Sequence, residues 1–205
     1  MFHIIESIVR SVLAEDIGLF KMVNASHTLF LDRFFSIVSY LGNGWVMFPL
    51  FSLVVFWRKR GSHRISILAI TAITLSISGA SNAVVKELVG RPRPAAYFIA
   101  PDTKTTTEEG PLFDVHVVGK RLHDDSFPSG HTNTAFALAA LAVLIFGKGL
   151  WPTFILAAMV ALSRVYLGFH FPLDTLAGAC LGSAVAFLIW RGASRLAQLD
   201  GSQAH

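Results

Sequence analysis

Apolar runs without charged residues recur along the chain between residues 44 and 190. A membrane-spanning helix needs roughly 17–25 mostly apolar residues. Ile65–Val85 meets this length with 21 residues and no charged side chain, and shorter runs meet it once a polar turn is added at one end. We therefore predict an all-α transmembrane helical bundle with five spans, centred on Gly44–Trp57, Ile65–Val85, Thr132–Gly147, Gly149–Ser163 and Thr175–Trp190.

The N-terminal region has a different pattern. Phe2–Met22 is amphipathic and carries five charged residues, which predicts a helix lying on the membrane surface. Phe30–Leu41 predicts a second, interfacial helix, and if residues 1–29 cross the bilayer instead, the bundle has six spans. The predicted regions are an N-terminal region (1–43), a transmembrane domain with an outer loop over residues 90–127 (44–191) and a flexible tail (192–205).

The composition indicates a membrane protein and excludes several other classes. Apolar residues make up 53% of the 205 residues and charged residues 15%, whereas a soluble domain has about 25% charged residues. A soluble protein of this size would lack the polar residues needed to cover its surface. The single cysteine, Cys180, excludes an intrachain disulfide framework. The net charge of +4 is too small, and the charges too scattered, for a nucleic-acid-binding surface.

Loop charges predict the orientation in the membrane. With alternating crossings, the basic residues between and after the spans fall on one side: Arg58, Lys59, Arg60, Arg64, Lys148, Arg191 and Arg195. Cytoplasmic loops collect Lys and Arg, so this side is predicted to be cytoplasmic. The long loop over residues 90–127 then lies outside, together with the ends of the spans that flank it.

Polar residues gather at the predicted outer ends of the spans. They are Lys86, Arg93, Ser129, His131, Ser163, Arg164, His170 and Asp174, with Pro128 and Gly130 on either side of Ser129. Ionisable residues at membrane depth are energetically costly and are usually functional. Three cations, two imidazoles and a carboxylate on one membrane face predict a phosphate site, because positioned cations stabilise the charge on a phosphoryl group during its transfer.

Three cations and a helix N-terminus supply the predicted phosphate-binding groups. The cations are Lys86, Arg93 and Arg164, and an arginine fork matches two phosphate oxygens at once. Ser129 and Gly130 open the third span, where the first backbone N–H groups of a helix are unpaired and attract an anion.

Two histidines and an aspartate supply the predicted reactive groups. His170 precedes Asp174 by four residues, with Pro172 favouring a helix start between them. A carboxylate that accepts a proton from one imidazole nitrogen leaves the other nitrogen free to attack phosphorus. His131 can protonate the leaving oxygen and then activate water. No group of residues has the spacing of a metal site, so we predict metal-free hydrolysis through a phosphohistidine, with no cofactor.

Three segments together resemble the signature of the type 2 phosphatidic acid phosphatase (PAP2) superfamily. They are Lys86-(six residues)-Arg93-Pro94, Pro128-Ser129-Gly130-His131 and Ser163-Arg164-(five residues)-His170-(three residues)-Asp174. The resemblance implies a helical-bundle phosphatase with His170 as nucleophile, Asp174 as its partner and His131 as acid and base. It also implies a phosphate cradle of Lys86, Arg93, Ser129, Gly130 and Arg164, with Ser163 and Pro128 in supporting places.

The resemblance is to small bacterial members, which implies a multi-pass protein of the inner (cytoplasmic) membrane with its site facing the periplasm. Undecaprenyl diphosphate, phosphatidylglycerol phosphate and phosphatidic acid all fit as substrates, and the first is favoured because it is a common substrate of this group. Lipid A phosphate is an alternative substrate. A vanadate-dependent haloperoxidase and a non-enzymatic lipid-phosphate-binding protein are alternative functions. The expected partners are the lipid and the bilayer, without nucleic acid or an obligate protein partner. The loop Ala95–Phe127 and the N-terminal amphipathic segment are expected to select the headgroup.

Overall fold

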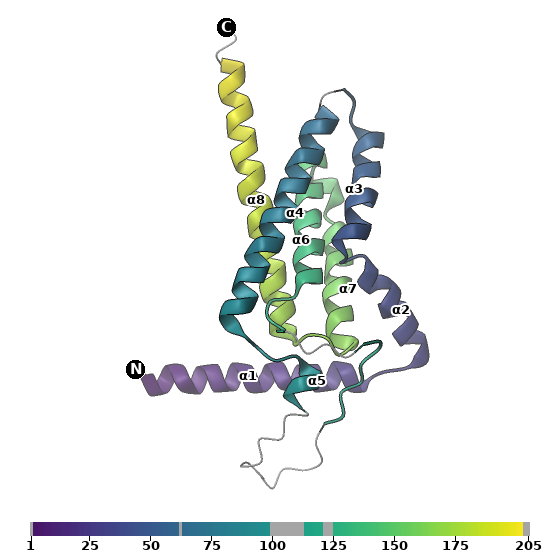
Figure 1. Ribbon diagram of the computed structural model, residues 1–205, viewed down its shortest axis with the longest axis vertical. Helices are drawn as coiled ribbons and strands as arrows, with labels where there is room; N and C mark the ends of the chain where they lie inside the picture. Colours follow the sequence, from purple (N-terminus) through teal and green to yellow (C-terminus); the bar gives the residue numbers. More distant parts are fainter. Residues whose placement is uncertain (1, 62, 99–112, 121–124, 203–205) are drawn as a thin grey trace.

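The computed structural model describes residues 2–61, 63–98, 113–120 and 125–202 of the chain. Within these ranges every regular element is a helix, which confirms the all-α prediction. The elements are α1 (Phe2–Ala25), α2 (Leu29–Tyr40), α3 (Gly44–Arg58), α4 (His63–Val89), α5 (Pro94–Tyr97), α6 (Gly130–Phe146), the short 3-10 helix η1 (Lys148–Leu150), α7 (Thr153–Tyr166) and α8 (Pro172–Ser202). Figure 1 shows α3, α4, α6 and α7 running alongside one another, with α1 lying across one end of the bundle.

Fewer helices meet the length of a membrane span than the five predicted. In the described ranges, three segments are long and apolar enough: His63–Tyr97, Lys148–Tyr166 and Pro172–Leu196. Helices α2 and α3 make a fourth only if they are taken together across a 64° bend, and α6 has 17 residues. A helix of that length rises about 26 Å, short of the roughly 30 Å hydrocarbon core. The chain is a helical membrane protein, and helix length alone does not establish five crossings.

The bend between α2 and α3 lies at the Gly-Asn-Gly sequence that follows the predicted interfacial helix. The Asn43 side chain caps α3 by accepting a hydrogen bond from the Trp45 backbone N–H at 2.9 Å. Gly42 is required because a Cβ atom at this position would lie 2.7 Å from the Cβ atom of His131. The bend therefore brings the α2–α3 connection against the first turn of α6.

Helix α6 is the central helix of the bundle. It contacts α3, α4, α7 and α8, and ten of its residues are buried. Two glycines of α8 allow the close approach: a Cβ atom would lie 2.5 Å from the Ser129 carbonyl oxygen at Gly178 and 2.1 Å from that of Asn133 at Gly182. The buried Asn133 amide exchanges two hydrogen bonds with Ser78 of α4, at 2.8 and 3.0 Å. These contacts fix the N-terminus of α6 relative to α4 and α8.

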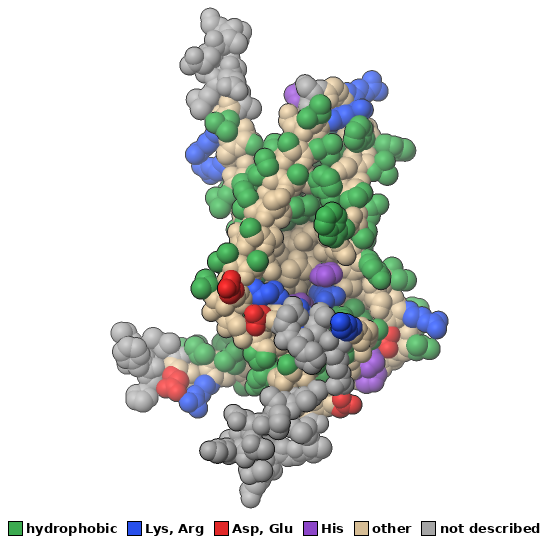
Figure 2. All heavy atoms as spheres, viewed as in Figure 1, with side chains coloured by type: hydrophobic (Ala, Val, Ile, Leu, Met, Phe, Trp, Pro, Cys, Tyr) green, Lys and Arg blue, Asp and Glu red, His purple; other side chains and the backbone are tan. Residues whose placement is uncertain are grey.

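The two ends of the bundle differ in their charges. The α3–α4 connection and the C-terminal part of α8 lie at one end, where Figure 2 shows Lys and Arg side chains. Helices α1 and α5 lie at the other end, where acidic, basic and histidine side chains are mixed. This separation agrees with the predicted alternation of the spans, and the side of the membrane that each end faces stays a prediction.

Helix α1 includes the segment predicted to be amphipathic, and its burial is one-sided. Asp16 and Phe20 are buried against the rest of the molecule, whereas the apolar side chains of Leu19 and Met22 are exposed. An apolar face left exposed on a helix that lies across the bundle end is suited to the membrane interface.

The predicted C-terminal tail lies largely within the described residues, whereas much of the predicted outer loop does not. Helix α8 continues to Ser202, so residues 192–202 are helical where a flexible tail was predicted. Residues 99–112 and 121–124 lie outside the described residues, and they include much of the loop expected to select the headgroup. That role and the boundaries 1–43 and 44–191 stay predictions.

Replacing Gly182 with Ala should weaken the α6–α8 contact, because the added Cβ atom would collide with the Asn133 carbonyl oxygen. Overpacking of this kind costs about 1–3 kcal/mol, so the melting temperature of the detergent-solubilised protein should fall. Gly192→Ala is the matched control, since a Cβ atom at Gly192 has open space and alanine favours a helix by about 1 kcal/mol over glycine. Equal melting temperatures for the two variants would contradict the packing described here.

Candidate active site

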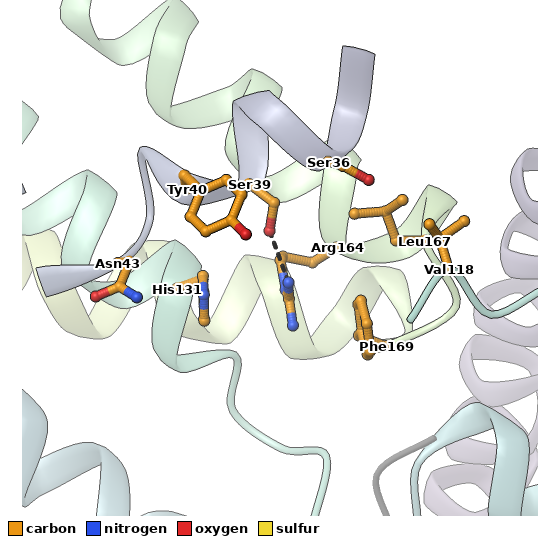
Figure 3. A pocket seen from close by; sticks show the side chains of 9 residues that line it. All are labelled: Ser36, Ser39, Tyr40, Asn43, Val118, His131, Arg164, Leu167 and Phe169. Carbon is orange, nitrogen blue, oxygen red and sulfur yellow. Dashed lines mark hydrogen bonds between the residues drawn. The ribbon is translucent and has the colours of Figure 1, made fainter. Parts of the chain in front are cut away.

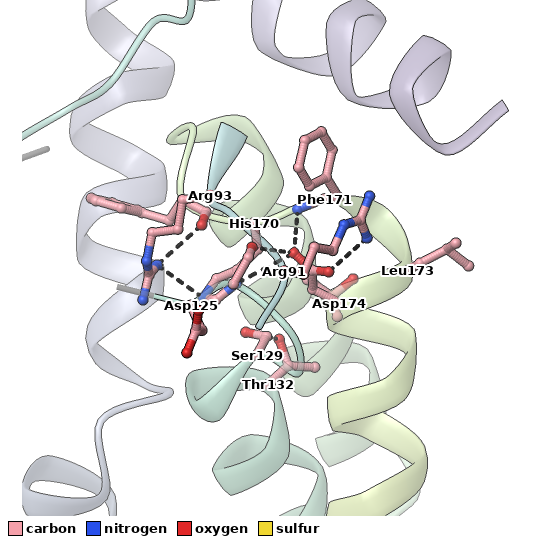
Figure 4. Close-up of polar contacts among 12 residues, drawn as sticks. Arg91, Arg93, Asp125, Ser129, Thr132, His170, Phe171, Leu173 and Asp174 are labelled. Atoms are coloured by element: carbon pink, nitrogen blue, oxygen red, sulfur yellow. Dashed lines mark hydrogen bonds and ion pairs between the residues drawn. The ribbon is translucent and has the colours of Figure 1, made fainter. Parts of the chain in front are cut away.

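The first turns of α6 and α8 meet at the end of the bundle that α1 crosses, and the predicted site residues gather there. Figure 4 shows Arg93, Ser129, His170 and Asp174 close together at this place. The backbone N–H of Ser129 donates to the backbone oxygen of Asp174 at 2.9 Å, so the two helix starts are joined directly. The site is therefore built on the ends of two packed helices.

His170 lies in the turn before α8, which starts at Pro172 as predicted. Its Nδ1 is 3.6 Å from Oδ2 of Asp174 and 3.4 Å from Oγ of Ser126, whose hydroxyl donates to the same Oδ2. At the opposite edge of the ring, Nε2 is 3.4 Å from Nη1 of Arg93. A guanidinium can only donate, so Nε2 is the unprotonated nitrogen and Nδ1 carries the proton that faces Asp174. The ring presents a free lone pair beside a cation.

Burial keeps the His170 ring neutral. The residue is 2% exposed, and this loss of hydration lowers the pKa of His170 to about 4. The positive charges of Arg164 and Arg93 act in the same direction, while Asp174 opposes them. The neutral imidazole is the form that has a nucleophilic nitrogen at pH 7.

Asp174 has no exposed surface, and both of its carboxylate oxygens accept hydrogen bonds. Oδ2 accepts from the Ser126 hydroxyl and from the Phe171 backbone N–H, the latter at 2.8 Å. Oδ1 accepts from Nη1 of Arg91, also at 2.8 Å. A buried carboxylate is stable only with such donors and a compensating cation, so these partners hold Asp174 ionised and in place.

Helix α1 reaches the site through Asp16, which is 3% exposed. One oxygen of Asp16 accepts from Nη2 of Arg91 at 2.6 Å, and the other accepts from the Leu173 backbone N–H at 2.8 Å. The Arg91 guanidinium also lies over the Phe171 ring, 4.1 Å from its centroid. The chain Asp16–Arg91–Asp174 thus ties α1 to the first turn of α8.

The end of α4 and the start of α6 border the same region. Lys86 donates from Nζ to the backbone oxygen of Asp125 at 2.5 Å, one residue before Ser126. Ser129 is the N-cap of α6, but its side chain makes no capping bond, and its hydroxyl accepts from Thr132 at 3.1 Å. The first backbone N–H groups of α6 are therefore not taken by a side-chain cap, which suits an anion.

His131 and Arg164 line a cavity of about 200 Å³ among α2, α6 and α7 (Figure 3). Arg164 donates from Nη1 to the Ser39 hydroxyl at 2.7 Å, and its guanidinium lies 4.2 Å from the centroid of the Phe169 ring. The Nε atom of Arg164 is buried and has no hydrogen-bond partner among the described residues. An unsatisfied guanidinium donor next to an imidazole is suited to bind a phosphate oxygen.

Ser163 has a different environment from the other predicted residues. Its buried hydroxyl donates to the Val160 backbone oxygen at 2.6 Å, within its own helix. Its supporting hydrogen bond is therefore to α7 and not to the other site residues. Pro128 is buried immediately before Ser129.

Sequence reasoning missed three residues that the structure brings to the site: Arg91, Ser126 and Asp16. Arg91 stands two residues before Arg93, and Ser126 stands two before Pro128, so closeness to the signature was an available signal. Asp16 has no such signal, because its two partners lie 75 and 157 residues further along the chain.

Replacing Asp16 with Ala should destabilise the protein by about 1–3 kcal/mol, because Arg91 loses one of its two carboxylate partners and the Leu173 backbone N–H loses its acceptor. The measurement is unfolding of the detergent-solubilised protein. Asp16→Asn should cost less, because its amide oxygen still accepts from the Leu173 N–H. Glu15→Ala, at an exposed position of the same helix, is the control. Equal stability of Asp16→Ala and Glu15→Ala would contradict the described network.

The His170 ring should stay neutral below the ordinary histidine range. In protein labelled with ¹⁵N-histidine, NMR should show an unprotonated Nε2 at pH 5.5 and protonation only near pH 4, because the folded-state pKa is about 4. The fold favours the neutral form, so this contribution to stability is present above about pH 6.5 and is lost as the pH falls toward 4. The spectrum of His170→Gln identifies the signal. A titration midpoint near 6.5 would show that the ring is not held neutral.

Comparisons with known proteins place this chain in a family. The model of the PAP2 superfamily matches residues 65–197. A lipid A 4'-phosphatase from Bacteroides thetaiotaomicron is 30% identical over 190 residues, covering 88% of this chain and 78% of that protein. An undecaprenyl-diphosphatase from Sulfolobus acidocaldarius is 28% identical over 174 residues, covering 84% of this chain and 76% of that protein.

A solved structure shares the helical arrangement. The crystal structure of Aquifex aeolicus LpxE has a TM-score of 0.69 and 28% identity, covering 85% of this chain and 94% of that chain. The family match includes every signature segment from Lys86 to Asp174 and most of the transmembrane region. The family match, the similarity to the lipid A 4'-phosphatase and the shared helical arrangement show that the chain belongs to the PAP2 superfamily, as its three signature segments predicted.

Proposed function

We propose that this PAP2 phosphatase hydrolyses a lipid phosphate without a metal ion, through a phosphohistidine formed on His170. The observation that carries the proposal is the state of the His170 ring, which is buried, with Nδ1 toward Asp174 and Nε2 beside Arg93. A lone pair next to a cation is suited to attack a phosphorus atom whose oxygens that cation holds. The names of the relatives, which act on lipid A and on undecaprenyl diphosphate, support a lipid substrate.

In the first proposed step, Nε2 of His170 attacks the phosphorus atom. The P–N bond forms as the bond from phosphorus to the lipid oxygen breaks, and protonated His131 gives its proton to that oxygen, so the lipid leaves as an alcohol or a phosphate. Arg93, Arg164, Lys86 and the first N–H groups of α6 hold the oxygens of the transferred group. Asp174 stabilises the positive charge that develops on the imidazole.

In the second proposed step, water hydrolyses the phosphohistidine. His131, now neutral, removes a proton from the water molecule, whose oxygen attacks phosphorus as the P–N bond breaks. Inorganic phosphate leaves, His170 returns to its neutral form and His131 is protonated for the next cycle. One imidazole therefore acts first as acid and then as base.

The proposed enzyme crosses the bacterial inner membrane five times, with α2 and α3 together forming one crossing and α4, α6, α7 and α8 the others. Its site faces the periplasm. Support comes from the basic residues at the end of the bundle opposite the site, which are typical of the cytoplasmic side. The exposed apolar residues of α1 at the site end are suited to the periplasmic interface of the inner membrane.

Phosphate release by the purified, detergent-solubilised protein with EDTA present tests this function. The substrates are undecaprenyl diphosphate, phosphatidylglycerol phosphate, phosphatidic acid and lipid A, and we expect release from at least one. His170→Ala should lower kcat/KM by at least about 10³-fold, since the nucleophile is removed. His63→Ala, at the exposed start of α4, is the matched control and should keep full activity.

Two outcomes would contradict the mechanism. Release that EDTA abolishes would implicate a metal ion, and release that persists in His170→Ala would exclude the phosphohistidine. Stoichiometric binding of phosphate without turnover would favour the lipid-phosphate-binding alternative.

A further inference from the structure

A second cavity borders His131, next to the cavity that contains Arg164. Its volume is about 270 Å³, and its walls come from the α2–α3 bend, α4 and the start of α6. The two cavities share Asn43 and His131, and Figure 3 shows His131 between Asn43 and Arg164. An acid that protonates a leaving group must stand between the phosphate and that group, and His131 stands between these two spaces.

The second cavity shares a lining residue with a groove between α3 and α4. Gly44, which lines it, also lines an apolar groove of about 590 Å³ between α3 and α4, together with Trp45 and Phe48. Trp45 is 89% exposed at the surface of the bundle. Because the second cavity shares residues with both the Arg164 cavity and this groove, we infer that a lipid with its phosphate beside Arg164 and its hydrocarbon in the groove has its connecting atoms in the second cavity.

Asn82 gives this cavity an unsatisfied polar atom. The residue is 7% exposed, lines the cavity, and its Oδ1 atom has no hydrogen-bond partner in the part of the chain that is described. A buried acceptor left without a donor costs about 1–3 kcal/mol, so such atoms usually have a partner. A hydroxyl or amide N–H of a ligand in the cavity would supply one.

The other walls of the second cavity are polar but carry no fixed positive charge. Asn43 and Thr134 supply further polar side chains, and none of the described residues that line the cavity is Lys or Arg. His131, which lines both cavities, gives up its proton in the first step and so cannot balance the charge of an anionic leaving group. Burying an anion without a cation is far more costly than burying a hydroxyl that finds a partner. The lining therefore favours a neutral group that carries hydroxyls over a second phosphate.

We propose that the second cavity binds the leaving group of the reaction, and that this group is a neutral, hydroxyl-bearing alcohol such as the sugar or glycerol unit of a lipid. The proposal rests on the proposed function and narrows it to phosphomonoesters. A polyprenyl diphosphate would place its second, anionic phosphate in the second cavity. It is therefore the poorer substrate, contrary to the preference that the sequence suggested.

The first test compares kcat/KM of the wild type for lipid A and phosphatidylglycerol phosphate, which have hydroxyl-bearing leaving groups, with that for undecaprenyl diphosphate. At least one of the two monoesters should exceed the diphosphate by about tenfold or more. p-Nitrophenyl phosphate is the reference substrate, because its leaving group has no further hydroxyl. Asn82→Ala should lower kcat/KM for the preferred monoester, relative to kcat/KM for p-nitrophenyl phosphate, by about 10- to 100-fold. Ser81→Ala, on the same turn of α4 but not lining the cavity, is the matched control.

The second test adds a charge to the same cavity. Gly79 lines it and has open space around its position, so a side chain can be introduced there without a collision at Cβ. Gly79→Lys should raise the ratio of diphosphate to monoester turnover by about tenfold, because it supplies the missing cation. Gly79→Leu, which adds an apolar, uncharged side chain at the same position, should not raise it.

A wild type that prefers the diphosphate, or an Asn82→Ala variant that lowers turnover of all substrates equally, would overturn the leaving-group assignment while the phosphatase function stands. An equal effect of Gly79→Lys and Gly79→Leu would also overturn it. Failure to release phosphate from every substrate, p-nitrophenyl phosphate included, would overturn the proposed function and this inference with it.

Discussion

The site depends on one carboxylate that has been removed from water. Asp174 has no exposed surface, and its charge is balanced by Arg91 and by donors from Ser126 and the Phe171 backbone. Because an uncompensated buried charge is very costly, each donor must be held where it is, and each belongs to a different part of the chain. Arg91 then requires Asp16, which brings α1 into the same network. Satisfying one aspartate thus organises the whole end of the bundle around His170.

The second constraint is the close packing of α6. Glycines on α8 and at the α2–α3 bend leave almost no space around its first turns, and Ser129 is bonded directly to the backbone of Asp174. A site built on rigid helix ends keeps its geometry better than one built on loops. In consequence His131 has a fixed place between two cavities, one with an unsatisfied arginine donor and one with an unsatisfied amide oxygen. The difference in charge between these cavities is what separates phosphate binding from leaving-group binding in our proposal.

Hydropathy and local signals predicted the helices well and their contacts poorly. The ends of Ile65–Val85 and Thr132–Gly147 differ from those of α4 and α6 by one to four residues, because a long apolar run between polar turns has few other structures. The pairing of His170 with Asp174 was also predictable, since both lie within one turn of Pro172. Asp16 and Gly42 could not be identified, because their roles come from partners far along the chain. The five crossings are not confirmed by helix length, because apolar runs in the sequence do not reveal the 64° bend between α2 and α3 or the shortness of α6.

The central claim is that His170 becomes phosphorylated during turnover, and rapid-quench labelling tests it most directly. Enzyme mixed with a ³²P-labelled lipid phosphate and quenched in alkali within milliseconds should carry acid-labile label on the peptide that contains His170. The label should decay as inorganic phosphate appears, and it should be absent from His170→Ala. Phosphate release with no labelled protein at any time, or label on another residue, would contradict the account.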